Sequence, residues 1–186
     1  MPLTILDPKT ALVLIDLQKG IVALAAQAAA EVVPRAAALA AAFRKQGLPV
    51  VLVNVAGGAP GRAEQSRGTA AFPADWTELV PELNRQPSDH LVTKRTWGAF
   101  TGTDLEAYLR KEGVTQIVLA GVATSIGVES TARHAYELGF NVTLALDAMA
   151  DLRPEAHANT LAHIFPRLGE TGTSQEIVAL LAKNNA

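Results

Sequence analysis

The stretch GVATSIGVES, residues 121–130, joins two segments of different periodicity. The apolar run IVLA at 117–120 precedes it and is typical of a strand buried on both faces. Over 125–139, apolar side chains recur at the spacing of one helix face. In an open α/β sheet, the turn from a strand into the next helix lies at the edge where ligands bind. The stretch therefore predicts an α/β fold with a candidate site at 121–130.

The same alternation of strand and helix patterns continues through the rest of the chain. Predicted strands cover 11–16, 49–55, 90–94, 116–122 and 141–148, with a sixth near 167–171. Predicted helices cover 31–46, 103–113, 125–139 and 154–164, and a last one follows Thr173. Near-continuous runs of Val, Ile and Leu separated by helices are typical of a parallel sheet covered on both faces.

Capping signals mark the starts of several predicted helices. Thr103 with Glu106, and Thr173 with Glu176, have the spacing of a capping box, in which two side chains satisfy free backbone N–H groups. Pro154 suits the first turn of the helix that follows it, because that position needs no N–H donor.

The composition limits the class of protein. Hydrophobic residues make up 49% of the 186 residues and charged residues 18%, which suits one domain with a sizeable core. The net charge of -2 and the lack of a basic run argue against a nucleic-acid partner. No apolar run is long enough for a membrane span and no signal peptide is apparent, so we expect a cytoplasmic protein. The absence of cysteine excludes disulfides and a thiol nucleophile.

One glycine-rich, polar segment, AGGAPGRAEQSRGTA at 56–70, differs from the rest of the chain. It follows the second predicted strand at the ligand edge, and long loops in compact domains are usually functional or disordered. We interpret it as a mobile lid or an oligomer contact.

Two charged residues stand at the ends of predicted strands. Asp16 ends the first strand and Lys94 ends the third, so both lie at the ligand edge. Singly, the aspartate suits a turn cap and the lysine a solvated surface position. Together they favour a functional pair, because a buried ion pair needs compensating interactions.

Gly127 lies where the helix after the fourth strand begins. Backbone N–H groups there favour an anion or a developing oxyanion, and a glycine leaves space beside them. The plainer interpretation is a glycine tolerated in a first helical turn, at a cost of about 1 kcal/mol relative to alanine.

At these residues the chain resembles the isochorismatase-like, or cysteine hydrolase, superfamily. The resemblance rests on LVLIDLQ (12–18), VTKRTWGAFTGTDLEAYLR (92–110) and GVATSIGVESTARHAYELGFNVTLALDA (121–148), in the family's order. It implies a Rossmann-like three-layer α/β/α sandwich with a six-stranded, mostly parallel sheet. It also implies a single isochorismatase-like domain over 1–186.

The resemblance assigns catalytic positions and exposes one departure. The family's catalytic triad is Asp, Lys and Cys; Asp16 and Lys94 match the first two, and Gly127 stands where the cysteine usually stands. A cis peptide common in the family would fall at 122–123. With no cysteine anywhere, the covalent thiol mechanism of nicotinamidases and carbamoyl-amide hydrolases is excluded. True isochorismatases also lack the nucleophile and hydrolyse a vinyl ether with the aspartate as proton donor. Several bacterial family members share the IGVESTAR version of the motif.

Other residues near these motifs are candidates for substrate contact. They are Gln18, Trp97, Phe100, Ala123, Thr124 and Ser125. Each has a simpler alternative: solvent exposure for the glutamine, core packing for the two aromatics, and helix capping for the two hydroxyls.

No metal or other cofactor is predicted. Metal-binding nicotinamidases have a cluster of Asp and His after the second strand, whereas the segment 54–70 contains neither residue. The four histidines are scattered along the chain.

Three functions fit the motifs. The first is a hydrolase of a small anionic metabolite that uses Asp16 as acid or base and Lys94 as charge stabiliser, without a covalent step. The second is a catalytically silent ligand-binding or regulatory protein, and the third is a structural oligomer with a vestigial pocket. The resemblance also implies a homo-oligomer, a dimer or tetramer. The two retained charges favour a working pocket over the third function.

Overall fold

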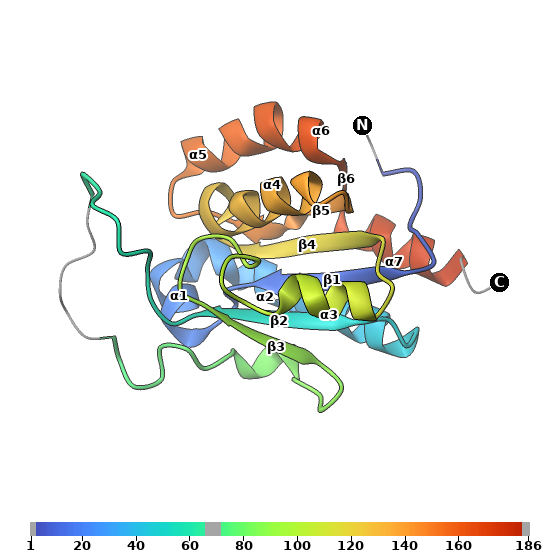
Figure 1. The fold of residues 1–186 in the computed structure, drawn as a ribbon, viewed down its shortest axis with the longest axis horizontal. Coiled ribbons are helices and arrows are strands. Elements are labelled where there is room, and N and C mark those ends of the chain that lie inside the picture. The colour runs from blue at the N-terminus through green and yellow to red at the C-terminus, as the bar shows by residue number, and fades with distance from the viewer. Residues whose placement is uncertain (1–2, 66–71, 184–186) are drawn as a thin grey trace.

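The computed structural model describes residues 3–65 and 72–183 and contains one six-stranded sheet, in the order β3-β2-β1-β4-β5-β6 (Figure 1). The strands are β1 (Thr10–Ile15), β2 (Val50–Val55), β3 (His90–Lys94), β4 (Gln116–Val122), β5 (Asn141–Ala150) and β6 (Glu170–Gly172). Every pairing between these strands is parallel. The prediction of a Rossmann-like three-layer fold with a mostly parallel sheet is confirmed.

Helices cover both faces of the sheet and enclose two separate cores (Figure 1). One face carries α1 (Lys19–Leu24), α2 (Ala26–Lys45), η1 (Pro81–Leu83) and α7 (Ser174–Lys183). The other face carries α3 (Leu105–Lys111) and α4 (Glu129–Glu137), and α5 (Pro154–Asn159) and α6 (Phe165–Leu168) lie beside α4. Each residue of β1, β2 and β4 is buried, which explains why these strands read as unbroken apolar runs.

Several helix boundaries differ from the predictions. The predicted helix at 31–46 begins earlier, at Ala26, because the alanine-rich residues before it have high helix propensity, and α1 was not predicted. The predicted helix at 125–139 begins as a π-helical turn, η2 (Thr124–Val128), and continues as α4. The helix after Pro154 continues through a second π-helical turn, η3 (Thr160–Ile164), into α6, so β6 starts later than predicted.

Only one of the two predicted capping boxes forms. Thr103 donates its hydroxyl to Ala99 O (2.5 Å) and accepts from Leu105 N (3.3 Å), so the helix begins two residues later than the box predicts. The second box is confirmed, since Glu176 N donates to the Thr173 hydroxyl and Thr173 N donates to the Glu176 carboxylate. That backbone donor lowers the pKa of Glu176.

Thr173→Ala should lower the free energy of unfolding by about 1 kcal/mol, because it removes the acceptor for a free N–H group at the start of α7. Urea denaturation at pH 7, where Glu176 is ionised, measures this loss. The exposed neighbour substitution Gln175→Ala is the control and should change the stability little. Equal effects of the two substitutions would contradict the capping role.

None of the helices in the described part of the chain is long and apolar enough to cross a membrane.

The N-terminal segment runs beside the short edge strand β6, where Leu3 N donates to Thr171 O and Thr4 N donates to the Glu170 carboxylate. Burial raises the pKa of Glu170, but the hydrogen bonds that its carboxylate accepts, chiefly from the hydroxyl and the backbone N–H of Thr4, lower it below its usual value.

Candidate active site

The strand order changes direction between β1 and β4, the topological switch point at which open α/β sheets form a ligand crevice. The chain winds outward from β1 to β2 and β3 on one side and from β4 to β5 and β6 on the other, so the connections after β1 and β4 diverge. Asp16 directly follows β1, and η2 follows β4 after a single residue, Ala123. Both segments therefore lie at the point where open α/β sheets bind ligands.

Close packing of the two central strands brings these segments together. Gly121 has a φ of +127°, and a Cβ built on it would lie 2.1 Å from Ile15 O. Only glycine therefore allows the end of β4 to approach the end of β1 so closely. The following peptide bond, Val122–Ala123, is cis, at the position that the family resemblance implied.

Asp16 is held in an unusual backbone conformation. Its φ of +53° lies in the left-handed region, which aspartate and asparagine tolerate better than other residues with side chains. Asp16 is 5% exposed, and its backbone N–H donates to Val53 O (2.9 Å). The bend after β1 thus places a buried carboxylate at the switch point between β1 and β4.

Lys94 forms a buried ion pair with this carboxylate. Its Nζ lies 2.7 Å from Asp16 Oδ2, and the lysine is 2% exposed. The ammonium also donates to the carbonyl oxygens of Trp97 (2.9 Å) and Thr96 (3.2 Å). Three acceptors thus match the three protons of the ammonium, which offsets the cost of burying its charge.

Gly127 completes the group. A Cβ built on Gly127 would lie 3.2 Å from Asp16 Oδ2, 3.6 Å from Lys94 Nζ and 2.9 Å from Ile15 Cγ2. A side chain at 127 would therefore project directly at the ion pair. The structure brings together all three residues that the sequence placed at catalytic positions.

A carboxylate anchors the first turn of η2. Asp151 Oδ2 accepts from both the backbone N–H and the hydroxyl of Ser125 (2.7 Å each), and its Oδ1 accepts from Arg153 N (3.0 Å). An anion at a helix start is favourable for its free N–H groups. The Asp151 carboxylate therefore caps this turn, whereas the Ser125 hydroxyl donates to that carboxylate.

The N–H groups of η2 are less available than the sequence suggested. Ser125 N is bound by Asp151, and the N–H groups of Ile126 and Val128 both donate to Ala123 O (3.2 Å each). These three donors serve the turn itself, so they are not available to an oxyanion.

Thr124 is fully buried at the start of η2, and its hydroxyl lies 2.9 Å from His157 Nδ1. This contact ties α5 to the turn that carries Gly127. Neither Asp151 nor His157 was singled out from the sequence as a site residue. Asp151 carried a usable signal, because it directly follows β5, but the predicted strand ended at 148 and left it in a loop.

Gln18 is a structural residue, in contrast to the predicted substrate contact. Its side chain is completely buried, and its amide donates to Val55 O (3.1 Å) and Trp76 O (2.8 Å) and accepts from Val55 N (2.6 Å). It braces the end of β2 against the segment before η1.

The two aromatic candidates have different positions. Phe100 is buried in the core with α3 and α4 and stacks on Phe140 at 6.1 Å, so the predicted pocket wall is wrong for this residue. Trp97 is 62% exposed, so its predicted core packing is wrong, while its carbonyl belongs to the Lys94 site.

The glycine-rich loop is only partly described. Residues 56–65 extend from the carboxyl edge of the sheet, whereas 66–70 lie outside the described residues. Two arginines hold the described part: Arg95 donates to Ala56 O (3.4 Å) and Arg153 donates to Gln65 Oε1 (3.2 Å).

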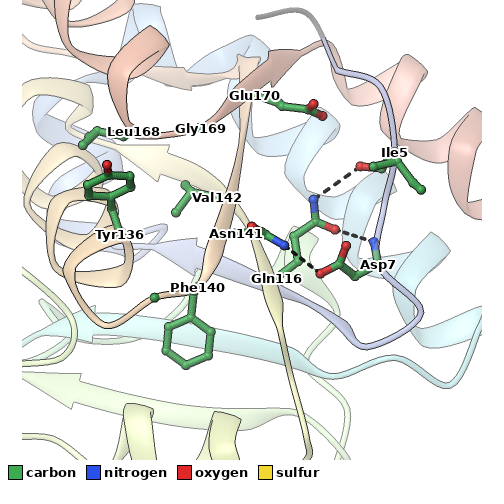
Figure 2. A pocket seen from close by; sticks show the side chains of 11 residues that line it. Ile5, Asp7, Gln116, Tyr136, Phe140, Asn141, Val142, Leu168, Gly169 and Glu170 are labelled. Carbon is green, nitrogen blue, oxygen red and sulfur yellow. Dashed lines mark hydrogen bonds between the residues drawn. The ribbon is translucent and has the colours of Figure 1, made fainter.

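A cavity of about 380 Å³ lies at the opposite, amino edge of the sheet (Figure 2). Gln116 and Asn141, at the first positions of β4 and β5, line it, and Gln116 bonds to Ile5 O and Asp7 N. The Asn141 amide also donates to the Asp7 carboxylate (3.0 Å), and the cavity is separate from the Asp16 site. Within 3–65 and 72–183, no group of three or more His, Asp or Glu side chains is placed to hold a metal ion.

The family model for the isochorismatase domain matches residues 10–176. The chain belongs to the isochorismatase family. Two isochorismatase family proteins are similar over nearly their whole length: YwoC of Bacillus subtilis is 48% identical over 177 residues, covering 91% of this chain and 93% of YwoC. YecD of Escherichia coli O157:H7 is 45% identical over 180 residues, covering 92% and 96%.

The isochorismatase family also accounts for the fold. An isochorismatase family protein of Burkholderia thailandensis has a solved structure that superposes with a TM-score of 0.89 at 42% identity, covering 96% of this chain and 98% of that one. The motifs that suggested this family from the sequence are therefore correctly assigned.

Proposed function

We propose that the chain is a hydrolase that acts on a small anionic metabolite without a covalent enzyme intermediate. The observation that carries the proposal is the position of Gly127. A Cβ built on this residue would lie 3.2 Å from Asp16 Oδ2 and 3.6 Å from Lys94 Nζ, so the first atom of any side chain there would contact the buried pair. Since the chain contains no cysteine, a thiol cannot supply the attacking atom, and in this proposal a water molecule supplies it.

The ion pair supports distinct roles for its two members. A neighbouring ammonium favours the ionised carboxylate, so Asp16 is suited to accept a proton from the attacking water. The oxygen of that water then bonds to the electrophilic carbon, while Lys94 stabilises the negative charge that develops on the substrate. The bond from that carbon to the leaving nitrogen or oxygen then breaks, and the proton held by Asp16 passes to the leaving atom. A proton-donor role for Asp16, as in vinyl ether hydrolysis, requires the protonated carboxylic acid instead.

The names of more distant relatives support hydrolysis as the reaction class. A probable isochorismatase of Pseudomonas chlororaphis is 34% identical over 111 residues, covering 60% of this chain and 53% of that protein. The ureidoacrylate amidohydrolase RutB of Agrobacterium fabrum is 36% identical over 77 residues, covering 41% and 34%. These names define the bond types to be tested: an ether on a double bond and an amide or ureide.

Two exposed arginines at the carboxyl edge of the sheet support the proposal of an anionic substrate. Arg95 and Arg153 follow β3 and β5 at the carboxyl edge, and both are exposed. Their long bonds to the loop at 56–65 leave guanidinium protons for a carboxylate, which arginine binds in a bidentate manner.

A turnover screen tests the proposal. Enol ethers, amides and ureides are each incubated with the protein as a carboxylate-bearing compound and as its neutral analogue, and products are followed by NMR. We expect hydrolysis of at least one carboxylate compound, with a lower kcat/KM for its neutral analogue. Saturable binding without turnover would instead identify a ligand-binding homologue, and a faster neutral analogue would overturn the anionic class.

The Gly127→Cys variant should contain an unusually reactive thiol. Lys94 favours the thiolate, and the nearby Asp16 carboxylate can accept the thiol proton, as the mechanism implied by the family resemblance requires. The same resemblance places the family's nucleophile at this position. We expect alkylation by iodoacetamide at pH 7 roughly tenfold faster than for free cysteine, whose pKa is about 8.5. The natural chain lacks cysteine, so thiolate absorbance reports on this one residue without requiring reagent access.

Gly58→Cys provides the matched control, because this position is exposed with nothing within 4 Å. Lys94→Met in the Gly127→Cys background should slow the reaction. If the thiol at 127 ionises at the same pH as the thiol at 58, or if its reaction rate does not change with residue 94, Gly127 does not occupy the nucleophile position.

A further inference from the structure

The two halves of the site are linked through one buried hydroxyl. Thr131 lies in α4, and it is completely buried. Its hydroxyl donates to Gly127 O (2.7 Å) and accepts from Ala99 N (3.1 Å). Gly127 belongs to η2 and Ala99 to the turn after β3, so this hydroxyl joins segments that are about thirty residues apart in sequence.

The turn after β3 controls the position of the lysine. It supplies the carbonyls of Thr96 and Trp97 that accept from Lys94 Nζ. The Thr96 hydroxyl donates to Gly98 O (3.0 Å), which stiffens the turn. A Cβ built on Gly98 would lie 3.4 Å from Ser130 O, so the turn also packs closely on the residue before Thr131.

The bond to Gly127 O alone would be ordinary. Threonine in a helix often donates to the carbonyl four residues before it. The second bond is different, because it fixes the turn after β3 relative to η2. Ala99 N is buried, and losing its acceptor leaves a buried donor unsatisfied, which drives a local rearrangement.

We infer that Thr131 is a positioning residue that sets the spacing between Lys94 and the space beside Gly127. Through Ala99 it holds the carbonyls that orient the ammonium, and through Gly127 O it holds the turn that the reacting atom faces. Thr131 contacts neither Asp16 nor Lys94 directly, so its effect on the reaction passes through these two segments. The inference rests on the proposed hydrolysis for its kinetic test and on the engineered thiol for a second test.

The kinetic test compares substitutions at Thr131 in the full-length chain. Thr131→Val keeps the shape and removes both hydrogen bonds, and we expect kcat to fall roughly 10–100-fold with little change in KM. Thr131→Ser keeps the hydroxyl and should restore most of kcat. Thr143→Val is the matched control, since it removes a buried threonine hydroxyl that accepts from Gln116 Nε2 (3.0 Å) near the opposite edge of the sheet.

The thiol test needs no turnover. In the Gly127→Cys background, Thr131→Val should raise the pH midpoint of thiolate formation, because Lys94 is no longer held beside the sulfur. Thr131→Ser and Thr143→Val should leave that midpoint unchanged. If Thr131→Val does not fold, Thr131→Ala removes the same hydroxyl from the helix.

The two tests separate the inference from the proposed function. A chain without turnover whose thiol midpoint still depends on the Thr131 hydroxyl would refute the hydrolase and support the positioning role. The positioning role is overturned if Thr131→Val and Thr143→Val lower kcat equally, if serine fails to rescue a folded variant, or if the thiol midpoint ignores residue 131.

Discussion

Asp16→Asn is expected to lower kcat by about 10²–10⁴-fold, the usual contribution of a general acid or base. Asparagine retains the shape of the side chain and tolerates the φ of +53° at this position, so the backbone bend after β1 should persist. What is lost is the ability to exchange a proton with water or substrate. Steady-state kinetics on the best substrate from the turnover screen measure the effect.

Asp7→Asn is the matched control for this loss. Asp7 lies at the amino edge and accepts from the Thr115 hydroxyl (2.7 Å) and the Asn141 amide (3.0 Å). The amide oxygen of asparagine can accept the same hydrogen bonds, and neither residue takes part in the proposed reaction. Its substitution should leave kcat nearly unchanged. If Asp16→Asn retained the rate of Asp7→Asn, the carboxylate would have no part in proton transfer and the proposed mechanism would fail.

Lys94→Met should reduce the free energy of unfolding by about 3–5 kcal/mol, as expected when one member of a buried ion pair is removed. Methionine fills most of the space of the lysine chain but leaves the buried Asp16 carboxylate without its ammonium. It also leaves the carbonyls of Thr96 and Trp97 without their donor. Urea denaturation at pH 7 measures the change.

A double variant separates charge from packing. Asp16→Asn combined with Lys94→Met removes the uncompensated charge and should recover part of the lost stability. Lys19→Met, which removes an exposed pair with Glu78, should have little effect. A loss for Lys94→Met as small as that for Lys19→Met would show that the pair does not contribute to the stability of the site.

The arrangement of the sheet could be predicted from the sequence because burial on both faces leaves an unmistakable pattern. After their first residues, Thr10 and Gln116, strands β1 and β4 consist of apolar residues and glycine, and the helices between the strands require parallel pairing. Asp16 and Lys94 could be found for the same reason, since each stands where such a run ends. Gly127 required the family resemblance, because a glycine carries no chemical signal of its own.

The interactions that surround the site could not be predicted. Asp151, His157 and Thr131 act through contacts between segments that are 26 to 33 residues apart, and local sequence patterns do not report such distances. Gln18 was misinterpreted because a polar residue after a strand resembles a ligand contact. Only its burial and its bonds to Val55 and Trp76 show that it joins two backbone segments.

The methyl group of Ile15 at 2.9 Å from a Cβ at residue 127 has a consequence for the history of this site. Two of the four glycine codons become a cysteine codon by a single nucleotide change, so a thiol at this position is a genetically accessible substitution. The protein does not accept that mutation freely, because overpacking of this kind typically costs about 1–3 kcal/mol. Valine at position 15 would keep the same Cγ2 methyl, so a smaller residue there is the permissive change. We therefore expect positions 15 and 127 to be coupled, so that a cysteine at 127 is accommodated best together with a smaller residue at 15.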